Sequence, residues 1–234
     1  MTELERILTG GGARLYRDRL DAGQKLATGL RNYAGRDVLV LGIPRGGAPV
    51  AAEVARHLDA ELDVIVARKL GAPGQPELAI GAVTANGGRF LNEEVISQLE
   101  VTDEYLKQVT ESEMAEARRR EQIFRRGRAA AAIKDRIVIV VDDGLATGAT
   151  MRASVRSVRK AEPAKLVVAV PVGSREACSA LRSEADVVVC LHEPELFWAV
   201  GFYYQNFEPT LDDDVTAILE EFRSRREVAG KIRK

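Results

Sequence analysis

The sequence predicts an α/β fold in which a parallel central sheet is flanked by helices. Five runs are rich in Val, Ile and Leu: residues 37–43, 63–70, 137–141, 165–170 and 186–191. Continuous apolar runs are typical of parallel strands, which are buried on both faces of the sheet. Helical patterns lie between these runs, and strands that alternate with helices imply right-handed crossovers. Ligands are then expected at the carboxyl ends of the strands.

Composition limits the classes of protein to which the chain can belong. Its 234 residues, 46% of them hydrophobic, suffice for one well-buried domain. A net charge of -1 provides no overall positive field, which disfavours nucleic acid as a partner. No apolar run approaches the length of a membrane span and no signal-peptide pattern begins at Met1, so we expect a cytoplasmic protein.

The cysteines and histidines show no spacing typical of a metal site. Cys178 and Cys190 are too far apart in the sequence for a CxxC motif, and His57 and His192 add no ligand spacing. Cysteine is among the residue types most often buried in proteins. We therefore interpret both cysteines as core residues.

A loose segment followed by a helix is predicted at the N-terminus. The glycine run at residues 10–12 follows no strand, so it lacks the context of a dinucleotide-binding fingerprint. In residues 18–33, Leu26 and Leu30 are four positions apart, which is helical spacing for one apolar stripe. Packing of this helix onto the core is the simplest interpretation.

Cations follow the first two predicted strands. Pro44-Arg45-Gly46-Gly47 comes after residues 37–43 and precedes a helix that runs to about Leu58. One cation, two glycines and a helix N-terminus can bring positive charge and backbone N–H groups against an anion such as pyrophosphate. A tight turn with an exposed arginine is the alternative. A nicotinamide oxidoreductase is disfavoured, because it would need a GxGxxG motif at this point and the chain has PRGG.

Residues 63–70 end in two adjacent cations, Arg68-Lys69. A solvated edge of the sheet is the alternative interpretation of this pair.

Two further elements precede the third strand of the predicted parallel sheet. Residues 79–83 and 89–91 flank Asn86-Gly87, a pairing typical of a β-hairpin. Residues 102–128 form one long helical pattern that begins at Thr102 or Asp103. Glutamates interleave with the arginines of this helix, which favours a salt-bridged solvated face over a nucleic-acid surface.

Residues 136–151, RIVIVVDDGLATGATM, are the most informative stretch. Five β-branched residues end in Asp142-Asp143, and a loop of small residues then leads into a helical pattern near Gly148. A loop at a helix N-terminus suits a phosphate. Adjacent carboxylates repel one another and disfavour a bare phosphate, but they suit neutral diols or a cation. A ribose 5-phosphate with a divalent ion satisfies every part of this pattern.

Residues 140–150, VVDDGLATGAT, resemble the phosphoribosyl pyrophosphate (PRPP) signature of type I phosphoribosyltransferases. The order of elements is similar from about residue 18 to about residue 215. The resemblance implies transfer of ribose 5-phosphate from PRPP to a nitrogenous base, with release of pyrophosphate and dependence on Mg2+. It also implies a flap hairpin that closes over PRPP, a hood over the base, and a non-proline cis peptide bond at Pro44–Arg45.

The resemblance assigns roles to individual residues. It implies a catalytic set of Asp142, Asp143, Arg45 and Lys69, in which the two acids bind the ribose hydroxyls directly or through the waters of Mg2+. The residues implied to bind the 5-phosphate are Gly144, Leu145, Ala146, Thr147, Gly148 and Thr150. Those implied to bind pyrophosphate are Arg45, Gly46, Gly47, Arg68 and Lys69. Ala146 stands where several base-salvage members carry an acid, while adenine- and uracil-type signatures also have alanine there.

An aromatic segment, residues 193–207, follows the last predicted strand. It is similar to the segment in hypoxanthine-guanine transferases that stacks a ring on the purine. Counting from Gly201 makes Trp198 the stacking residue, whereas counting from Pro194 makes it Phe197, and we favour Trp198. A cluster that seals the C-terminal helix or forms a dimer contact is the alternative interpretation.

The predicted organisation is one phosphoribosyltransferase-like domain over residues 1–234. It comprises an N-terminal segment and hood helix at 1–35, a core at 36–192 with a flap at about 71–91, and an aromatic segment with a closing helix at 193–234. Small-molecule substrates are expected, no membrane partner is expected, and a homodimer is left open. The rival function is a PRPP- or nucleotide-sensing regulatory protein on the same fold.

Overall fold

The computed structural model describes residues 14–232, with side chains up to residue 225. The glycine run at residues 10–12 therefore lies outside the described residues. Within the described part, five strands form one parallel sheet in the order β2-β1-β6-β7-β8. The strands are β1 (Val38–Gly42), β2 (Glu61–Val64), β6 (Ile137–Val141), β7 (Lys165–Val172) and β8 (Val187–His192). The predicted α/β fold with a parallel central sheet is confirmed.

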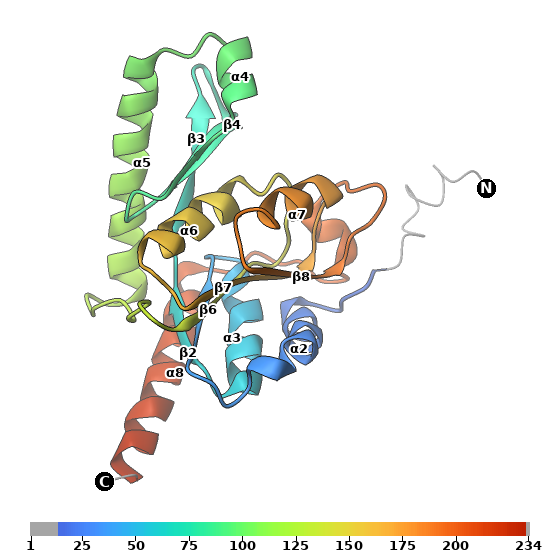
Figure 1. Cartoon of the computed structure of the whole chain (residues 1–234), viewed down its shortest axis with the longest axis vertical. Helices are drawn as coiled ribbons and strands as arrows, with labels where there is room; N and C mark the ends of the chain where they lie inside the picture. The colour runs from blue at the N-terminus through green and yellow to red at the C-terminus, as the bar shows by residue number, and fades with distance from the viewer. Residues whose placement is uncertain (1–13, 233–234) are drawn as a thin grey trace, which may run out of the picture.

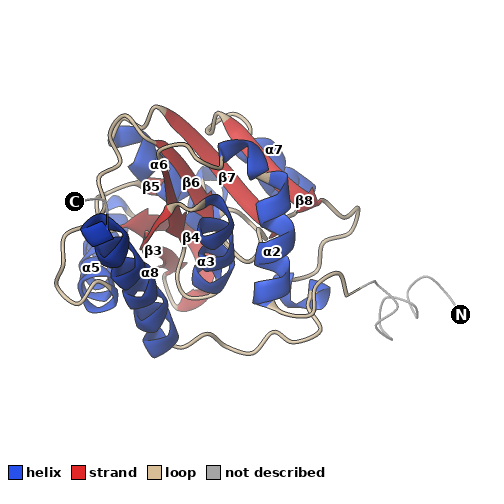
Figure 2. Cartoon of the chain, turned by 90° about the horizontal axis from the view of Figure 1, so that it is seen from below, coloured by secondary structure: helices blue, strands red, loops and turns tan. Residues whose placement is uncertain are grey.

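Helices cover both faces of this sheet (Figures 1 and 2). One face carries α2 (Arg19–Gly29) and α3 (Gly47–Leu58), with α8 (Asp212–Ile232) beside them. The other face carries α6 (Ala149–Lys160) and α7 (Arg175–Leu181). Leu26 and Leu30 are fully buried in the first of these layers, so the predicted packing of the N-terminal helix onto the core is confirmed. A short 3-10 helix, η1 (Arg31–Tyr33), follows α2.

A second sheet stands beside the first and forms an arm with α4 and α5 (Figure 1). Its antiparallel strands are β3 (Ala67–Ala72), β4 (Gln75–Thr84) and β5 (Arg89–Leu91), and they are followed by α4 (Glu93–Gln98) and α5 (Asp103–Phe124). Gly87 has a φ of 75°, a left-handed conformation that favours glycine, and it turns the chain between β4 and β5. The predicted hairpin is confirmed.

The predicted continuous strand over residues 63–70 is wrong. The chain leaves the parallel sheet after Val64, and β3 of the arm begins only at Ala67. The linking residues Ile65 and Val66 are 5% and 3% exposed. Because burial continues through the link, the apolar pattern gives no sign that one sheet ends and another begins. As a consequence, Arg68 and Lys69 belong to the arm and do not end a strand of the parallel sheet.

Arg119 and Arg120 of α5, and Arg125 directly after it, pair with carboxylates, as predicted for a salt-bridged helix. Arg118 instead donates to the carbonyl of Ala85. Arg125 is buried; its Nε lies 2.9 Å from Oδ1 of Asp63, and its Nη1 lies 2.7 Å from Oε2 of Glu121. Burial alone would lower the pKa of Arg125, but the charges of Asp63 and Glu121 outweigh it and raise that pKa. On the solvent side, Arg119 and Arg120 hold the pKa of Glu116 at about 2. In the described part of the chain, no helix is long and apolar enough to cross a membrane.

Candidate active site

The loop after β1 and the acidic pair after β6 are in direct contact. β1 and β6 are parallel neighbours in register, so both strands end at the same edge of the sheet. A Cβ atom at Gly46 would lie 2.0 Å from Oδ2 of Asp143, and one at Gly47 would lie 2.9 Å from Oδ1 of Asp142. Only glycine permits this approach. The structure therefore brings together two loops that are far apart in the sequence.

The peptide bond between Pro44 and Arg45 is cis, as predicted. The N–H of Gly47 donates to the carbonyl of Ile43 at 3.0 Å, which closes the turn into α3. The side chain of Arg45 is 47% exposed, and its Nη1 lies 3.6 Å from Oδ1 of Asp212 at the start of α8. The backbone of this loop thus faces the acidic pair, whereas the guanidinium group reaches toward α8.

The loop between β6 and α6 is anchored by the last residue of β7 and by the segment that follows this strand. The N–H of Leu145 donates to the carbonyl of Val172 at 2.9 Å, and the N–H of Ser174 donates to the carbonyl of Leu145 at 2.8 Å. The hydroxyl of Ser174 also donates to the carbonyl of Ala146 at 2.8 Å. Leu145 is 2% exposed, so the loop is fixed through a buried anchor.

The tip of the same loop faces solvent. Ala146 and Thr147 are exposed, Gly148 has a φ of 77°, and α6 begins at the next residue. The first N–H groups of a helix have no acceptor within the helix, and with the helix dipole they favour an anion. Thr150 lies in this first turn and is half-buried. The loop predicted to bind phosphate is therefore accessible at its tip and rigid at its base.

Arg19, at the start of α2, forms an ion pair with the acidic pair. Its Nε lies 2.8 Å from Oδ2 of Asp143, and the two side chains are 12% and 14% exposed. The N–H of Asp143 donates to Oδ1 of Asp142 at 2.9 Å. Burial and the charge of Asp143 raise the pKa of Asp142, and burial raises the pKa of Asp143 against the opposing effect of Arg19. The raised pKa values mean that the negative charge of each carboxylate is destabilised in the fold. A bound cation would stabilise that charge, so the pair is suited to a cation.

The raised pKa of Asp142 leads to a prediction about stability. The folded carboxyl binds its proton more tightly than the unfolded one, so the free energy of unfolding should fall as pH rises above about 3.8 and through the raised pKa. Asp142→Asn removes this cost and keeps an acceptor for the Asp143 N–H. We expect the variant, without Mg2+ or PRPP, to be more stable than the wild type at neutral pH by on the order of 1 kcal/mol.

Thermal unfolding of both proteins between about pH 4 and pH 8 checks this prediction. The two curves should converge at the acid end, where Asp142 is protonated. Equal pH dependence of the two proteins would show that Asp142 is not under electrostatic strain.

The two cations of β3 lie on opposite faces of the arm. Nε of Arg68 lies 2.8 Å from Oε2 of Glu113 on α5. Lys69 pairs in register with Ala82, and cross-strand partners have their side chains on the same face. Ala82 packs against Ala149 and Ala153 of α6, so the Lys69 side chain is on the face of the arm turned toward α6. The structure therefore places Lys69 on the face of the arm that packs on α6 and Arg68 on the face that packs on α5.

The aromatic segment packs against the acidic pair. A Cβ atom at Gly144 would lie 2.4 Å from Cγ1 of Val200, in the 3-10 helix η2 (Val200–Tyr203). The hydroxyl of Tyr204 donates to the carbonyl of Asp143 at 2.6 Å. Phe197 packs in a small apolar cluster with Tyr16, Ala22, Val172 and Tyr204, whereas Trp198 is 58% exposed. Of the two candidates for stacking on an acceptor, Trp198 is the more exposed.

Sequence reasoning missed three residues of this site. Arg19 pairs with Asp143, and Tyr204 fixes the backbone of Asp143. Ser174 anchors residues 144–148, the loop predicted to bind phosphate, which we call the phosphate-type loop. Arg19 follows Asp18, the N-cap of α2, so a helix start was readable there. Its partner was not readable, because 124 positions separate the two side chains in the sequence.

Comparisons with known proteins identify relatives of this chain. A family model described as a phosphoribosyl transferase domain matches residues 14–206. A Mycobacterium tuberculosis protein, Rv0571c, which is named provisionally as a phosphoribosyl transferase, is 46% identical over 216 residues. The match covers 92% of this chain and 48% of the relative, so the chain spans about half the length of the curated relatives it matches.

Solved structures show the same architecture. The crystal structure of the protein TT1426 from Thermus thermophilus has a TM-score of 0.74 and 45% sequence identity, with coverage of 88% of this chain and 98% of that one. A hypothetical protein from Neisseria gonorrhoeae, solved with bound ppGpp, has a TM-score of 0.50 and 14% identity. That match covers 88% of this chain and 93% of the other, and at this identity the likeness concerns the fold alone.

Proposed function

Because this chain belongs to the phosphoribosyltransferase family, we propose that it transfers ribose 5-phosphate from PRPP to a nitrogen of a purine or pyrimidine base and releases pyrophosphate. The transition state of such a displacement carries positive charge on the ribose and negative charge on the departing pyrophosphate. Positioning and electrostatic complementarity then account for catalysis, and no protein nucleophile is needed.

One observation carries the proposal. The glycines of the β1 loop touch the carboxylates of Asp142 and Asp143, next to an exposed loop at a helix N-terminus. Two loops proposed to bind anions therefore flank a pair of acids. PRPP carries a pyrophosphate, a diol and a 5-phosphate in that order, and it matches this arrangement group by group.

Each part of the site has a proposed role. The 5-phosphate accepts hydrogen bonds from the amides of residues 146–148 and from Thr150. Leu145, which the resemblance also assigned to this phosphate, is buried, and its N–H donates to Val172 instead. The carboxylates of Asp142 and Asp143 accept from the ribose hydroxyls. The pyrophosphate lies against the amide of Gly46, whereas the N–H of Gly47 donates to the carbonyl of Ile43 and closes the turn. The Lys69 ammonium supplies positive charge when the arm is positioned over the site. Closure of the arm would exclude water from the reactive sugar.

Mg2+ is the proposed cofactor, and Asp142 with Asp143 would hold it, through water. Bound there, the ion would neutralise negative charge on the leaving pyrophosphate. Arg19 already pairs with Asp143, so we propose that this arginine balances the carboxylate in the ligand-free state. Arg45 would then exchange its exposed ion pair with Asp212 for the pyrophosphate.

Thermal unfolding with PRPP and Mg2+, followed by pyrophosphate release across a panel of bases, tests this function. PRPP with Mg2+ should raise the melting temperature, since a ligand that binds only the folded state stabilises it. One base should then release pyrophosphate catalytically. A melting temperature that PRPP with Mg2+ leaves unchanged would contradict the proposal.

A sensor of PRPP or of another nucleotide is the second candidate function. Ala146 offers no acid to accept a proton from a base, and it lies exposed at the tip of the loop. The Neisseria gonorrhoeae protein with bound ppGpp shares the fold, which can therefore hold a nucleotide. Stabilisation by PRPP or ppGpp without pyrophosphate release from any base would favour this second function.

Replacing Trp198 with alanine should raise the KM for the base about 10-fold and leave the KM for PRPP nearly unchanged. The reason is that stacking of a base on an aromatic ring contributes about 1–3 kcal/mol. Leu196→Ala is the matched control, because Leu196 is similarly exposed at 64% and lacks a ring. Steady-state kinetics with each substrate varied in turn provide the measurement. A larger rise in the KM for PRPP would instead indicate a packing role for Trp198.

A further inference from the structure

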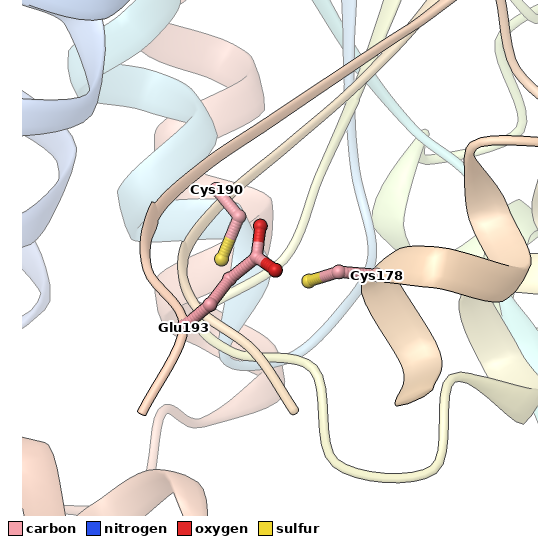
Figure 3. A group of neighbouring side chains, drawn as sticks. All are labelled: Cys178, Cys190 and Glu193. Atoms are coloured by element: carbon pink, nitrogen blue, oxygen red, sulfur yellow. The ribbon is translucent and has the colours of Figure 1, made fainter. Parts of the chain in front are cut away.

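A cluster of two thiols and a carboxylate lies beside Gly173, which pairs with Leu145 of the phosphate-type loop. Cys178 belongs to α7, Cys190 lies near the end of β8, and Glu193 follows that strand (Figure 3). One Sγ atom from each cysteine and a carboxylate oxygen of Glu193 lie within 4.8 Å of one another. Among the described residues, this is the one group of three His, Cys, Asp or Glu side chains with such mutual distances. Cys178 is a core residue, as interpreted from the sequence, and Cys190 is half-buried and packs against the same core cluster.

A glycine keeps the space beside the two sulfur atoms open. A Cβ atom at Gly173 would lie 2.7 Å from Sγ of Cys178 and 3.4 Å from Sγ of Cys190. Any larger residue would enter the cluster. The thiol of Cys190 donates to the carbonyl of His192 at 3.2 Å, and Cys178 is fully buried. Both sulfur atoms are thus held by the fold on the same side of Gly173.

The donor set suits a thiophilic divalent cation. Thiolates and a carboxylate are ligands of Zn2+, with Zn–S distances of about 2.3 Å and Zn–O distances of about 2.1 Å. Tetrahedral geometry then needs sulfur atoms about 3.8 Å apart, which a small movement can produce from atoms already within 4.8 Å. Cys190 and Glu193 have two residues between them, which is the spacing of paired ligands in zinc sites.

Charge also favours such a site. Two thiolates and one carboxylate carry three negative charges, and a bound divalent cation would reduce the net charge of the site to -1. Arg182 pairs with Glu193 and balances that remaining charge. The Glu193 side chain is 26% exposed and that of Arg182 is 50% exposed, so the carboxylate end of the cluster meets solvent. Glu193 can bind Arg182 through one oxygen and a metal through the other.

We propose that Cys178, Cys190 and Glu193 form a binding site for Zn2+, with a fourth position open to water. The cation replaces the two thiol protons, which pass to solvent, and no electrons are transferred. The site joins α7 to the end of β8. It lies against Gly173, which bridges to Leu145 of the phosphate-type loop, so the bound ion would fix the base of that loop. This inference is independent of the transferase reaction.

Cobalt titration of the full chain, reduced with a phosphine, tests the site. We expect one Co2+ per chain, a thiolate-to-cobalt charge-transfer band, displacement by Zn2+ and release of about two protons. Cys190→Ser should remove the band. Glu193→Gln should weaken cobalt binding at least about 10-fold, because it removes a ligand without touching the core. Glu195→Gln, an acid 85% exposed two residues away, is the matched control and should bind as the wild type does.

Three results would overturn the proposal. The first is the absence of a thiolate band in the folded, reduced wild type. The second is equal affinity of the Glu193→Gln variant and the wild type. The third is a protein that takes up no metal when reduced but loses two hydrogens in mass with a disulfide oxidant such as oxidised glutathione. That last result would identify the pair as a dithiol.

Discussion

Replacing Gly46 with alanine is expected to weaken PRPP binding about 100-fold while the protein remains folded. Gly46 has a φ of -62° and a ψ of -34°, which alanine adopts without strain, so the effect is steric. The added methyl group would lie 2.0 Å from Oδ2 of Asp143 and 3.2 Å from Nε of Arg19. Because these atoms end side chains, the carboxylate can move aside and the backbone can stay. Displacement of a binding group by about 1 Å is enough for an effect of this size.

Calorimetric titration of PRPP with Mg2+, together with the melting temperature of the ligand-free variant, provides the measurement. The matched control is Gly29→Ala, near the end of α2, whose added methyl group would lie 3.5 Å from Leu191 in ordinary contact. The control should bind PRPP as the wild type does. Wild-type affinity in Gly46→Ala would show that contact between the two loops is irrelevant to the ligand.

Asp143→Asn should also weaken PRPP binding, by about 100-fold, and should lower kcat/KM by at least as much. The carboxylate is proposed to accept from a ribose hydroxyl, and a hydrogen bond to a charged group contributes about 1.5–3 kcal/mol. Asparagine has nearly the same shape but carries no charge. The loss of charge also leaves Arg19, which is only 12% exposed, without its ion pair. Titration calorimetry and pyrophosphate release measure the two effects.

Asp213→Asn is the matched control for this variant. Asp213 lies in the first turn of α8 and is exposed, so the same change of charge occurs outside the acidic pair. It should leave PRPP binding within about twofold of the wild type, in line with the small energies of exposed charges. If Asp213→Asn and Asp143→Asn weaken binding equally, net charge explains the loss and the proposed role of Asp143 fails.

The sequence was most informative where chemistry is local. Residues 137–148 contain a buried strand, two acids and a loop at a helix start, and the structure places all three as predicted. The cis peptide bond at Pro44–Arg45 and the hairpin turn at Gly87 were also predicted correctly. For the strand, the loop and the hairpin turn, adjacent residues impose the conformation, so a short stretch of sequence carries enough information. The cis bond was implied by the family resemblance.

The prediction of one strand over residues 63–70 was wrong because this apolar run contributes strands to two different sheets. Residues 63–70 remain buried across the link at Ile65 and Val66, and hydrophobicity reports burial without naming the partner strand. The same limit applies to Arg68 and Lys69. Which face each cation occupies depends on the register of β3 with β4, and that register is a property of the folded arm.

By itself, then, the sequence determined the α/β class, the family resemblance and the segments that carry charge or are proposed to bind anions. Tertiary structure alone decided which side chains meet. The pairing of Arg19 with Asp143, and the grouping of Cys178 with Cys190 and Glu193, arise from helices and strands packed together across the sheet. Contacts of this kind depend on the angle and depth at which whole elements pack, and local propensity does not encode that geometry.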